Sequence, residues 1–204
     1  ELAEADISDV SLGQLATEIY TSHRDALLTL PAATRNHHAF VGGYLEHVLN
    51  VTKNCVYLAE RYAEQYPEMT PPLDTSLGGA GGMLRDIGKL RELELNAEGA
   101  RYTPDGQLVG HILLGRDVVR EAAPDAGVDG ELLLRLEHII VSHQRLPEWG
   151  SPKPPMTPEA LLVHYADDVD AKFEMIAQAL ADDRGEGPFT PRSYTLGHAV
   201  FRGE

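Results

Sequence analysis

Histidines and aspartates recur along this chain on either side of one central carboxylate. They are His47, Asp86, His111, His138, His143 and Asp167. Imidazole nitrogens and carboxylate oxygens are ligands for divalent cations such as Mn²⁺, Mg²⁺, Fe²⁺ and Ni²⁺, and a carboxylate can bridge two of them. A cation held in this way, with coordination positions left open, activates water beside a phosphate. The pattern predicts a site for one or two divalent metal ions that performs phosphate chemistry.

The order of these residues resembles the HD superfamily of metal-dependent phosphohydrolases. The shared signature is His47, Asp-Ile-Gly-Lys at 86–89, His111, His143 and Asp167. Over residues 15–200, the segments 31–33, 37–40, 42–47, 110–112, 148–153 and 164–167 are also similar to the HD domains of 3′-to-5′ exoribonucleases. The resemblance implies an all-α, HD-domain helical bundle. It also implies a phosphohydrolase that acts on a phosphodiester or nucleotide, as a 3′-to-5′ exoribonuclease does. The alternative is a degenerate HD domain that binds a nucleotide or a protein partner without turnover.

Asp86 is the expected bridging ligand. The other ligands fall into two sets, one for each ion: His47 with Asp167, and His111 with His143. His138 precedes His143 by five residues on one predicted helix, so the two side chains point roughly 140° apart. We therefore favour His143 as the ligand. His138 is the alternative, and otherwise packs the helix or supports a ligand.

The chain departs from the family at the His-Asp doublet, where the histidine is replaced by Arg85. A guanidinium stays protonated and cannot coordinate a metal, and its charge would repel one. Two outcomes stay open: the site binds one ion elsewhere among the ligands, or it binds none and Arg85 pairs with Asp86 or a substrate phosphate. Asp86, Lys89 and Arg85 are the predicted catalytic residues, since either cation can balance charge on a phosphoryl group.

Four residues are expected to contact the substrate, which would be a nucleotide or the end of a short single-stranded RNA or DNA. Lys89 has the charge of a phosphate partner. His37 and His38 lie in a predicted loop, where they contact substrate or donate a proton, or else cap and pack a helix. Trp149 lies in a proline-rich loop over 145–158 and either stacks on a base or ribose or anchors that loop.

The apolar spacing predicts helices over 9–29, 39–66, 74–88, 109–123, 129–143 and 158–182. A small β-hairpin or flap is expected over 90–108, with a turn at Pro104, Asp105 and Gly106. The glycines at 78, 79, 81 and 82 lack phosphate-loop spacing and predict close helix packing, and Gly88 suits the end of that helix. In the last helix, Tyr165 and Phe173 belong to the expected apolar stripe.

Length and composition predict one domain over 1–204, with an N-terminal helix to residue 30, an HD core over 31–182 and a tail over 183–204. The net charge of −15, from 32 acidic and 17 basic residues, argues against a broad phosphate-binding surface, so nucleic acid must enter locally. No signal peptide or long apolar run is apparent, and we expect a cytoplasmic protein with no membrane contact. The oligomeric state is left open. In the resembled exoribonucleases an OB-fold precedes the HD domain, which implies a module missing here.

Overall fold

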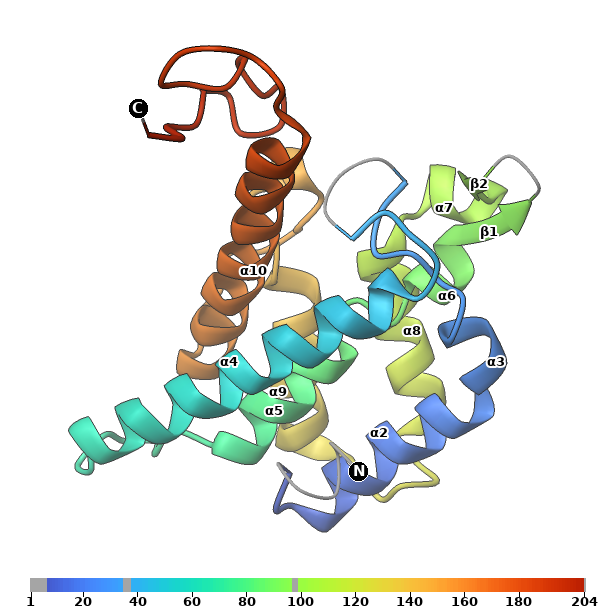
Figure 1. Ribbon diagram of the computed structural model, residues 1–204. Coiled ribbons are helices and arrows are strands. Elements are labelled where there is room, and N and C mark those ends of the chain that lie inside the picture. The colour runs from blue at the N-terminus through green and yellow to red at the C-terminus, as the bar shows by residue number, and fades with distance from the viewer. Residues whose placement is uncertain (1–6, 35–37, 97–98, 204) are drawn as a thin grey trace.

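The computed structural model describes residues 7–34, 38–96 and 99–203. It is a helical bundle with one small antiparallel hairpin, which confirms the expected all-α HD architecture (Figure 1). The elements follow in this order: α2 (Val10–Ser22), α3 (Arg24–Leu27), α4 (Gly43–Gln65), α5 (Thr75–Leu84), α6 (Lys89–Glu92), β1 (Leu93–Asn96), β2 (Gly99–Tyr102), α7 (Pro104–Leu108), α8 (His111–Ala122), α9 (Gly130–Ser142), the 3-10 turn η1 (Pro147–Trp149) and α10 (Pro158–Asp182). Among the described residues, none of the helices combines the length and hydrophobicity that a bilayer span requires.

Helix α5 lies at the centre of the bundle. Its residues from Ser76 to Leu84 are all buried, and it contacts α2, α4, α9 and α10. Asp74 begins the helix, because its side chain accepts a hydrogen bond from the Leu77 N–H. A helix that neighbours surround on all sides needs apolar or small residues throughout, and the run Thr75–Leu84 supplies them.

The glycines of α5 let its neighbours approach closely. A Cβ on Gly81 would lie 2.8 Å from Cγ2 of Ile139 in α9, and one on Gly82 would lie 3.1 Å from Cα of Thr52 in α4. Each glycine therefore fills a position where a larger residue would push a helix away. This confirms that the run serves close packing.

After α5 the chain turns through residues 85–88, which carry Arg85 and Asp86. The expectation that Gly88 ends the helix is wrong, because α5 ends at Leu84 and Gly88 directly precedes α6, with a φ of −65° that is available to any residue. Its role is steric instead. A Cβ on Gly88 would lie 2.0 Å from the carbonyl oxygen of His111, so glycine is what allows the start of α8 to pack on this turn. That approach brings His111 towards Asp86.

The hairpin β1–β2 follows within the expected segment, with Leu93 opposite Tyr102. The predicted turn at residues 104–106 is instead the first turn of α7. Thr103 caps it by accepting from the Gly106 N–H, and Pro104 occupies the first helical position. Proline and a preceding threonine suit a helix start as well as a turn, which is why the pattern was ambiguous.

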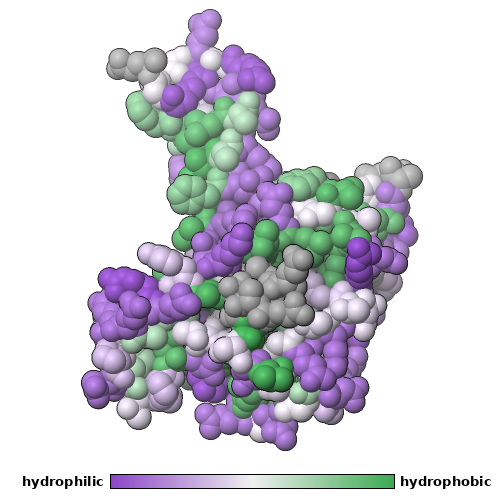
Figure 2. All heavy atoms as spheres, turned by 60° about the horizontal axis from the view of Figure 1, so that its bottom comes forward, coloured by the Kyte–Doolittle hydropathy of each residue, from purple (hydrophilic) through white to green (hydrophobic). Residues whose placement is uncertain are grey.

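Helix α10 packs one face on the core and leaves the other outside. Leu162, Val163 and Ala166 are buried, whereas Tyr165 is 47% exposed and Phe173 70% exposed. The expectation that the last two belong to the core-facing stripe is therefore wrong. Tyr165 lies with Leu161 and Val169 on the outer face of α10, which is exposed. Phe173 lies in the C-terminal half of the helix, which projects beyond the bundle (Figure 1). Figure 2 shows hydrophobic side chains on this projecting part.

Candidate metal centre

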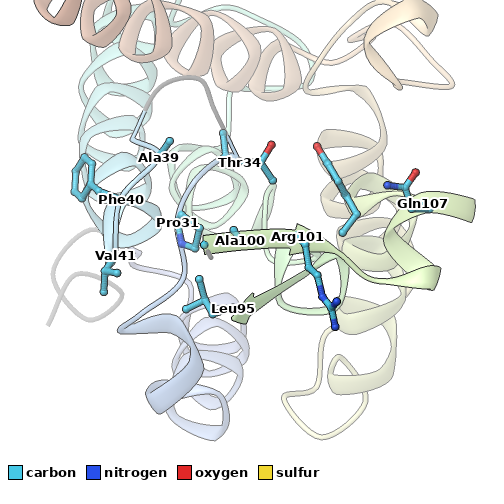
Figure 3. Close-up of a pocket in the computed structure, with 12 residues that line it drawn as sticks. Pro31, Thr34, Ala39, Phe40, Val41, Leu95, Ala100, Arg101 and Gln107 are labelled. Carbon is cyan, nitrogen blue, oxygen red and sulfur yellow. The ribbon is translucent and has the colours of Figure 1, made fainter. Parts of the chain in front are cut away.

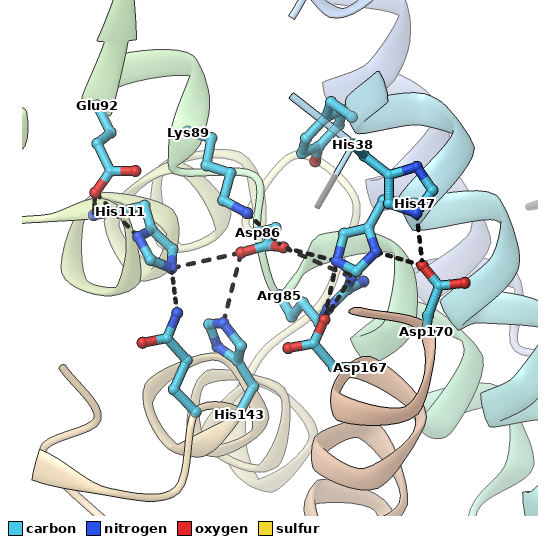
Figure 4. Close-up of polar contacts among 12 residues, drawn as sticks. His38, His47, Arg85, Asp86, Lys89, Glu92, His111, His143, Asp167 and Asp170 are labelled. Atoms are coloured by element: carbon cyan, nitrogen blue, oxygen red, sulfur yellow. Dashed lines mark hydrogen bonds and ion pairs between the residues drawn. The ribbon is translucent and has the colours of Figure 1, made fainter. Parts of the chain in front are cut away.

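Asp86 lies at the middle of the polar side chains shown in Figure 4 and directs its two carboxylate oxygens to different groups. Oδ2 accepts a hydrogen bond of 2.9 Å from Lys89 Nζ. Oδ1 lies 3.4 Å from His111 Nε2 and 3.5 Å from His143 Nε2. No donor among the described residues forms a hydrogen bond to this buried oxygen. Asp86 therefore faces two distinct clusters, one through each oxygen.

Glu92, at the end of α6, fixes the orientation of His111. Its Oε1 accepts from the backbone N–H of His111 at 2.9 Å and from Nδ1 at 3.0 Å. An ionised carboxylate has no proton to donate, so we assign the ring proton to Nδ1. In the neutral form of the ring the lone pair is then on Nε2, which faces Asp86 and is hydrogen-bonded to the Gln144 amide nitrogen at 3.3 Å.

His143 follows α9 and is fully buried. Its Nδ1 donates to the carbonyl oxygen of Ile140 at 2.8 Å, which again places the lone pair on Nε2. That Nε2 atom has no hydrogen-bond partner within the described part of the chain. From α10, His164 Nδ1 donates to the carbonyl oxygen of His143 at 2.8 Å and holds its backbone in place.

Three lone pairs therefore converge, those of Asp86 Oδ1, His111 Nε2 and His143 Nε2, and these atoms lie within 4.8 Å of one another. Two of these acceptors, Asp86 Oδ1 and His143 Nε2, are buried without a hydrogen-bond partner among the described residues, whereas His111 Nε2 is hydrogen-bonded to the Gln144 amide. Two unsatisfied buried acceptors this close together are unfavourable unless a cation lies among them. Atoms that share one ion at bond lengths of about 2.1 Å lie about 3.0 to 3.5 Å apart. The separations of 3.4 and 3.5 Å from Asp86 match this range. The three residues fit one divalent metal ion.

The second cluster lies on the Oδ2 side of Asp86. His47, near the start of α4, donates from Nδ1 to Asp170 Oδ2 at 2.7 Å, so its lone pair is on Nε2. Arg85 Nη2 lies 2.7 Å from this nitrogen and 3.0 Å from Asp167 Oδ1. The candidate ligand atoms of His47, Asp86 and Asp167 also lie within 4.8 Å of one another. The Arg85 guanidinium, however, already contacts His47 and Asp167.

Opposite charges hold this centre in its ionised form. Burial raises the pKa of Asp86, but Lys89 and Arg85 outweigh that effect and hold the pKa well below its usual range. Burial also raises the pKa of Asp167, but the adjacent positive charge of Arg85 is the main cause that reverses this and holds the pKa far below its ordinary value. The pKa of Arg85 is raised, because Asp167 and Asp86 outweigh the effect of burial. Both carboxylates are therefore charged at neutral pH.

A cavity of about 380 Å³ opens on the first cluster and is lined by Lys89, His111, Gln144 and Trp149, among others. The Lys89 side chain is largely buried, and Trp149 is 53% exposed at the rim. The two predicted substrate contacts, Lys89 and Trp149, thus border the same cavity as the ligand His111.

Other predicted residues lie elsewhere. His38 is buried and bonded through Nε2 to Asp170 Oδ2 at 3.0 Å, so it supports the second cluster and does not line the cavity. His138 accepts from the Met156 N–H at 2.8 Å and belongs to neither cluster. His37 lies outside the described residues.

Glu92 and Gln144, both beside His111, were not predicted from the sequence. Glu92 and Glu94 are two residues apart, yet Glu92 is buried and Glu94 is exposed and paired with Arg101 at 2.8 Å. No spacing distinguished the two glutamates, because the difference depends on where α8 begins to pack. Gln144, directly after His143, carried one available signal: adjacency to a predicted ligand.

With this geometry established, comparison with known proteins identifies the class. Residues 44–172 match the HD domain. The chain is 36% identical over 196 residues to the 3′-5′ exoribonuclease YhaM of Bacillus licheniformis, and 35% identical over 196 residues to that of Bacillus pumilus. Each alignment covers 96% of this chain and 59% of the relative. No solved structure matches. The chain belongs to the HD domain family.

Proposed function

We propose that this chain is a divalent-metal-dependent phosphohydrolase that shortens RNA from its 3′ end. The observation that carries the proposal is the convergence of three lone pairs, from Asp86, His111 and His143, beside Lys89 and next to a cavity. A divalent cation bound there would polarise a phosphoryl oxygen and acidify a water. The similarity to relatives described as 3′-5′ exoribonucleases supports RNA as the substrate.

Lys89 supplies the positive charge for the phosphoryl group. Its Nζ lies 2.9 Å from Asp86 Oδ2, and the residue lines the cavity. Because the side chain is largely buried, its charge is less screened than that of a surface lysine. It is therefore placed to stabilise charge that develops on phosphoryl oxygens. Trp149, at the rim, offers a ring on which a terminal base can stack.

A larger cavity of about 880 Å³ extends the proposed path for the strand, between the segment after α3 and the hairpin (Figure 3). It shares Ala33, Thr34 and Tyr102 with the cavity at the metal centre. Phe40 and Leu95 are apolar parts of its wall, and of the lining residues that the structure describes, Arg101 is the single cationic one. Such a wall suits bases better than a row of phosphates, consistent with the net charge of −15.

The direct test is RNA shortening by the purified chain. A short single-stranded RNA labelled at its 5′ end is incubated with Mn²⁺, and with chelator in place of Mn²⁺. We expect progressive shortening from the 3′ end with Mn²⁺ and none with chelator. Asp86→Asn should abolish shortening, because it removes the negative charge of the central metal ligand. The matched control is Asp168→Asn, which alters a partly exposed aspartate paired with Lys172. Shortening that survives either chelator or Asp86→Asn would refute the proposal.

A second candidate function is nucleotide binding without hydrolysis, and Arg85 in the position of a family histidine favours it. The same experiment separates the two functions. RNA that is retained by the chain in the presence of Mn²⁺ but keeps its full length would indicate a binding domain.

A further inference from the structure

The second cluster, formed by His47, Asp86 and Asp167, has the acceptor atoms of a metal site but no open position for an ion between them. His47 Nε2, which carries the lone pair, lies 3.0 Å from Asp167 Oδ1 and 3.7 Å from Asp86 Oδ2. Two acceptors this close repel each other unless a positive group joins them. In this chain that group is Arg85, whose Nη2 contacts both His47 and Asp167.

Each nitrogen of the Arg85 guanidinium faces an oxygen atom of the protein. Nε donates to Asp167 Oδ1 at 3.1 Å, Nη1 donates to the carbonyl oxygen of Gly82 at 2.5 Å, and Nη2 lies 3.6 Å from Asp86 Oδ2. Arg85 is fully buried. A planar, permanently charged fork suits several fixed acceptors at once. Because its donors are directed at protein atoms and the group is inaccessible, a contact between Arg85 and a substrate phosphate is not part of this arrangement.

We propose that the Arg85 guanidinium occupies the position of a metal ion in the cluster of His47, Asp86 and Asp167, so that the centre binds one divalent ion and not two. This inference rests on the proposed function and specifies how many metal ions its centre binds. The ligand atoms of that cluster fit a cation by type and spacing, but a side chain of this protein already supplies the cation. The sequence alone left open whether Arg85 allows one ion or none, and the geometry favours one.

Charge balance supports a single ion. Arg85 and Lys89 both lie on the Oδ2 side of Asp86, and together with Asp86 and Asp167 they give a formal charge of zero. A divalent ion on that side would be placed next to two positive groups. The Oδ1 side is different, because there Asp86 and His143 present buried atoms that lack a hydrogen-bond partner among the described residues. The two sides of one carboxylate therefore have different affinities for a metal ion.

The first measurement uses the natural chain with Mn²⁺ alone. The chain is stripped with chelator, saturated with Mn²⁺ and desalted, and the bound metal is determined per chain by elemental analysis. Electron paramagnetic resonance then distinguishes an isolated Mn²⁺ ion from an exchange-coupled pair. We expect one ion per chain and the spectrum of an isolated ion. Two ions with a coupled spectrum would overturn this inference and leave the proposed function intact, whereas no bound ion would overturn both.

The second measurement uses Arg85→His, which removes the guanidinium and adds an imidazole at the same position. We expect this variant to bind two Mn²⁺ ions and to show the coupled spectrum. Binding of only one ion by a folded Arg85→His variant would overturn the inference, because Arg85 would then not be what excludes the second ion. Circular dichroism establishes whether the variant is folded.

If Arg85→His does not fold, a third measurement with another variant still tests the inference. Asp167→Asn retains the guanidinium and removes a carboxylate that contacts Arg85 in this arrangement. We expect this variant to keep one Mn²⁺ ion per folded chain. Loss of that ion would show that Asp167 is a ligand, contrary to the inference.

Discussion

Glu92 offers the sharpest test of how the metal centre is built, because both of its hydrogen bonds to His111 end on the same oxygen. Oε1 accepts from the backbone N–H and from Nδ1 of that histidine. In Glu92→Gln the backbone donor should hold the amide oxygen in the same place, so geometry is kept and charge is lost. In Glu92→Ala both acceptor bonds disappear. The pair of variants therefore separates the charge of Glu92 from its orienting role.

The expected size of the effect follows from these bonds. Burial raises the pKa of Glu92, but the side-chain and backbone hydrogen bonds from His111 and the nearby positive charge of Lys89 together outweigh this and lower the pKa, so the carboxylate is ionised at neutral pH. A hydrogen bond to a charged group contributes about 1.5 to 3 kcal/mol and a neutral one about 0.5 to 1.5 kcal/mol. The difference of about 1 to 1.5 kcal/mol predicts Mn²⁺ affinity about tenfold weaker in Glu92→Gln. Loss of orientation in Glu92→Ala should weaken it about a hundredfold.

Isothermal titration with Mn²⁺ measures both variants against the natural chain. Glu94→Gln is the matched control, since Glu94 is two residues away but exposed and paired with Arg101. Its affinity should stay within about twofold of the natural value, as expected for a surface ion pair. Unchanged Mn²⁺ affinity in Glu92→Ala would show that His111 does not bind the ion, and the assignment of the centre would fail.

Three further predictions concern the scaffold. Gly88→Ala should lower the free energy of unfolding by about 3 kcal/mol, because its Cβ would meet the backbone of His111. Gly78→Ala is the control and should not lower it, because its Cβ would make only an ordinary contact at 3.6 Å. Urea denaturation compares the two variants. Burial raises the pKa of Asp170, but two histidine hydrogen bonds outweigh it and hold the pKa below its ordinary value. Its contribution to stability is thus present above about pH 4 and lost on further acidification, so thermal melting should show Asp170→Asn to be more damaging at about pH 5 than at about pH 3. Burial raises the pKa of Cys55 to about 12. We therefore expect iodoacetamide to label Cys55 at mildly alkaline pH only after the chain unfolds. Labelled Cys55 detected by mass spectrometry in the folded chain would contradict this.

The sequence by itself determined the helices and the residue types available for chemistry. Helices could be predicted because their signals are local: apolar residues recur each turn, and Asp74 and Thr157 begin helices through bonds to residues three positions away. The close packing around α5 could also be predicted, since its glycines suit no phosphate loop. The limits of these elements were less certain, and the segment after Thr103 formed a helix instead of a turn.

The tertiary structure decided which of those residues meet. His143 and His138 lie on neighbouring turns, yet the packing of α9 directs His143 towards Asp86 and leaves His138 bonded to the backbone of Met156. Which face of α10 is buried likewise depends on where the bundle ends. Arg85 shows the physical reason most clearly. Its charge was evident from the sequence, but its role depends on acceptors from α4, α5 and α10, and only the fold brings these together around the guanidinium.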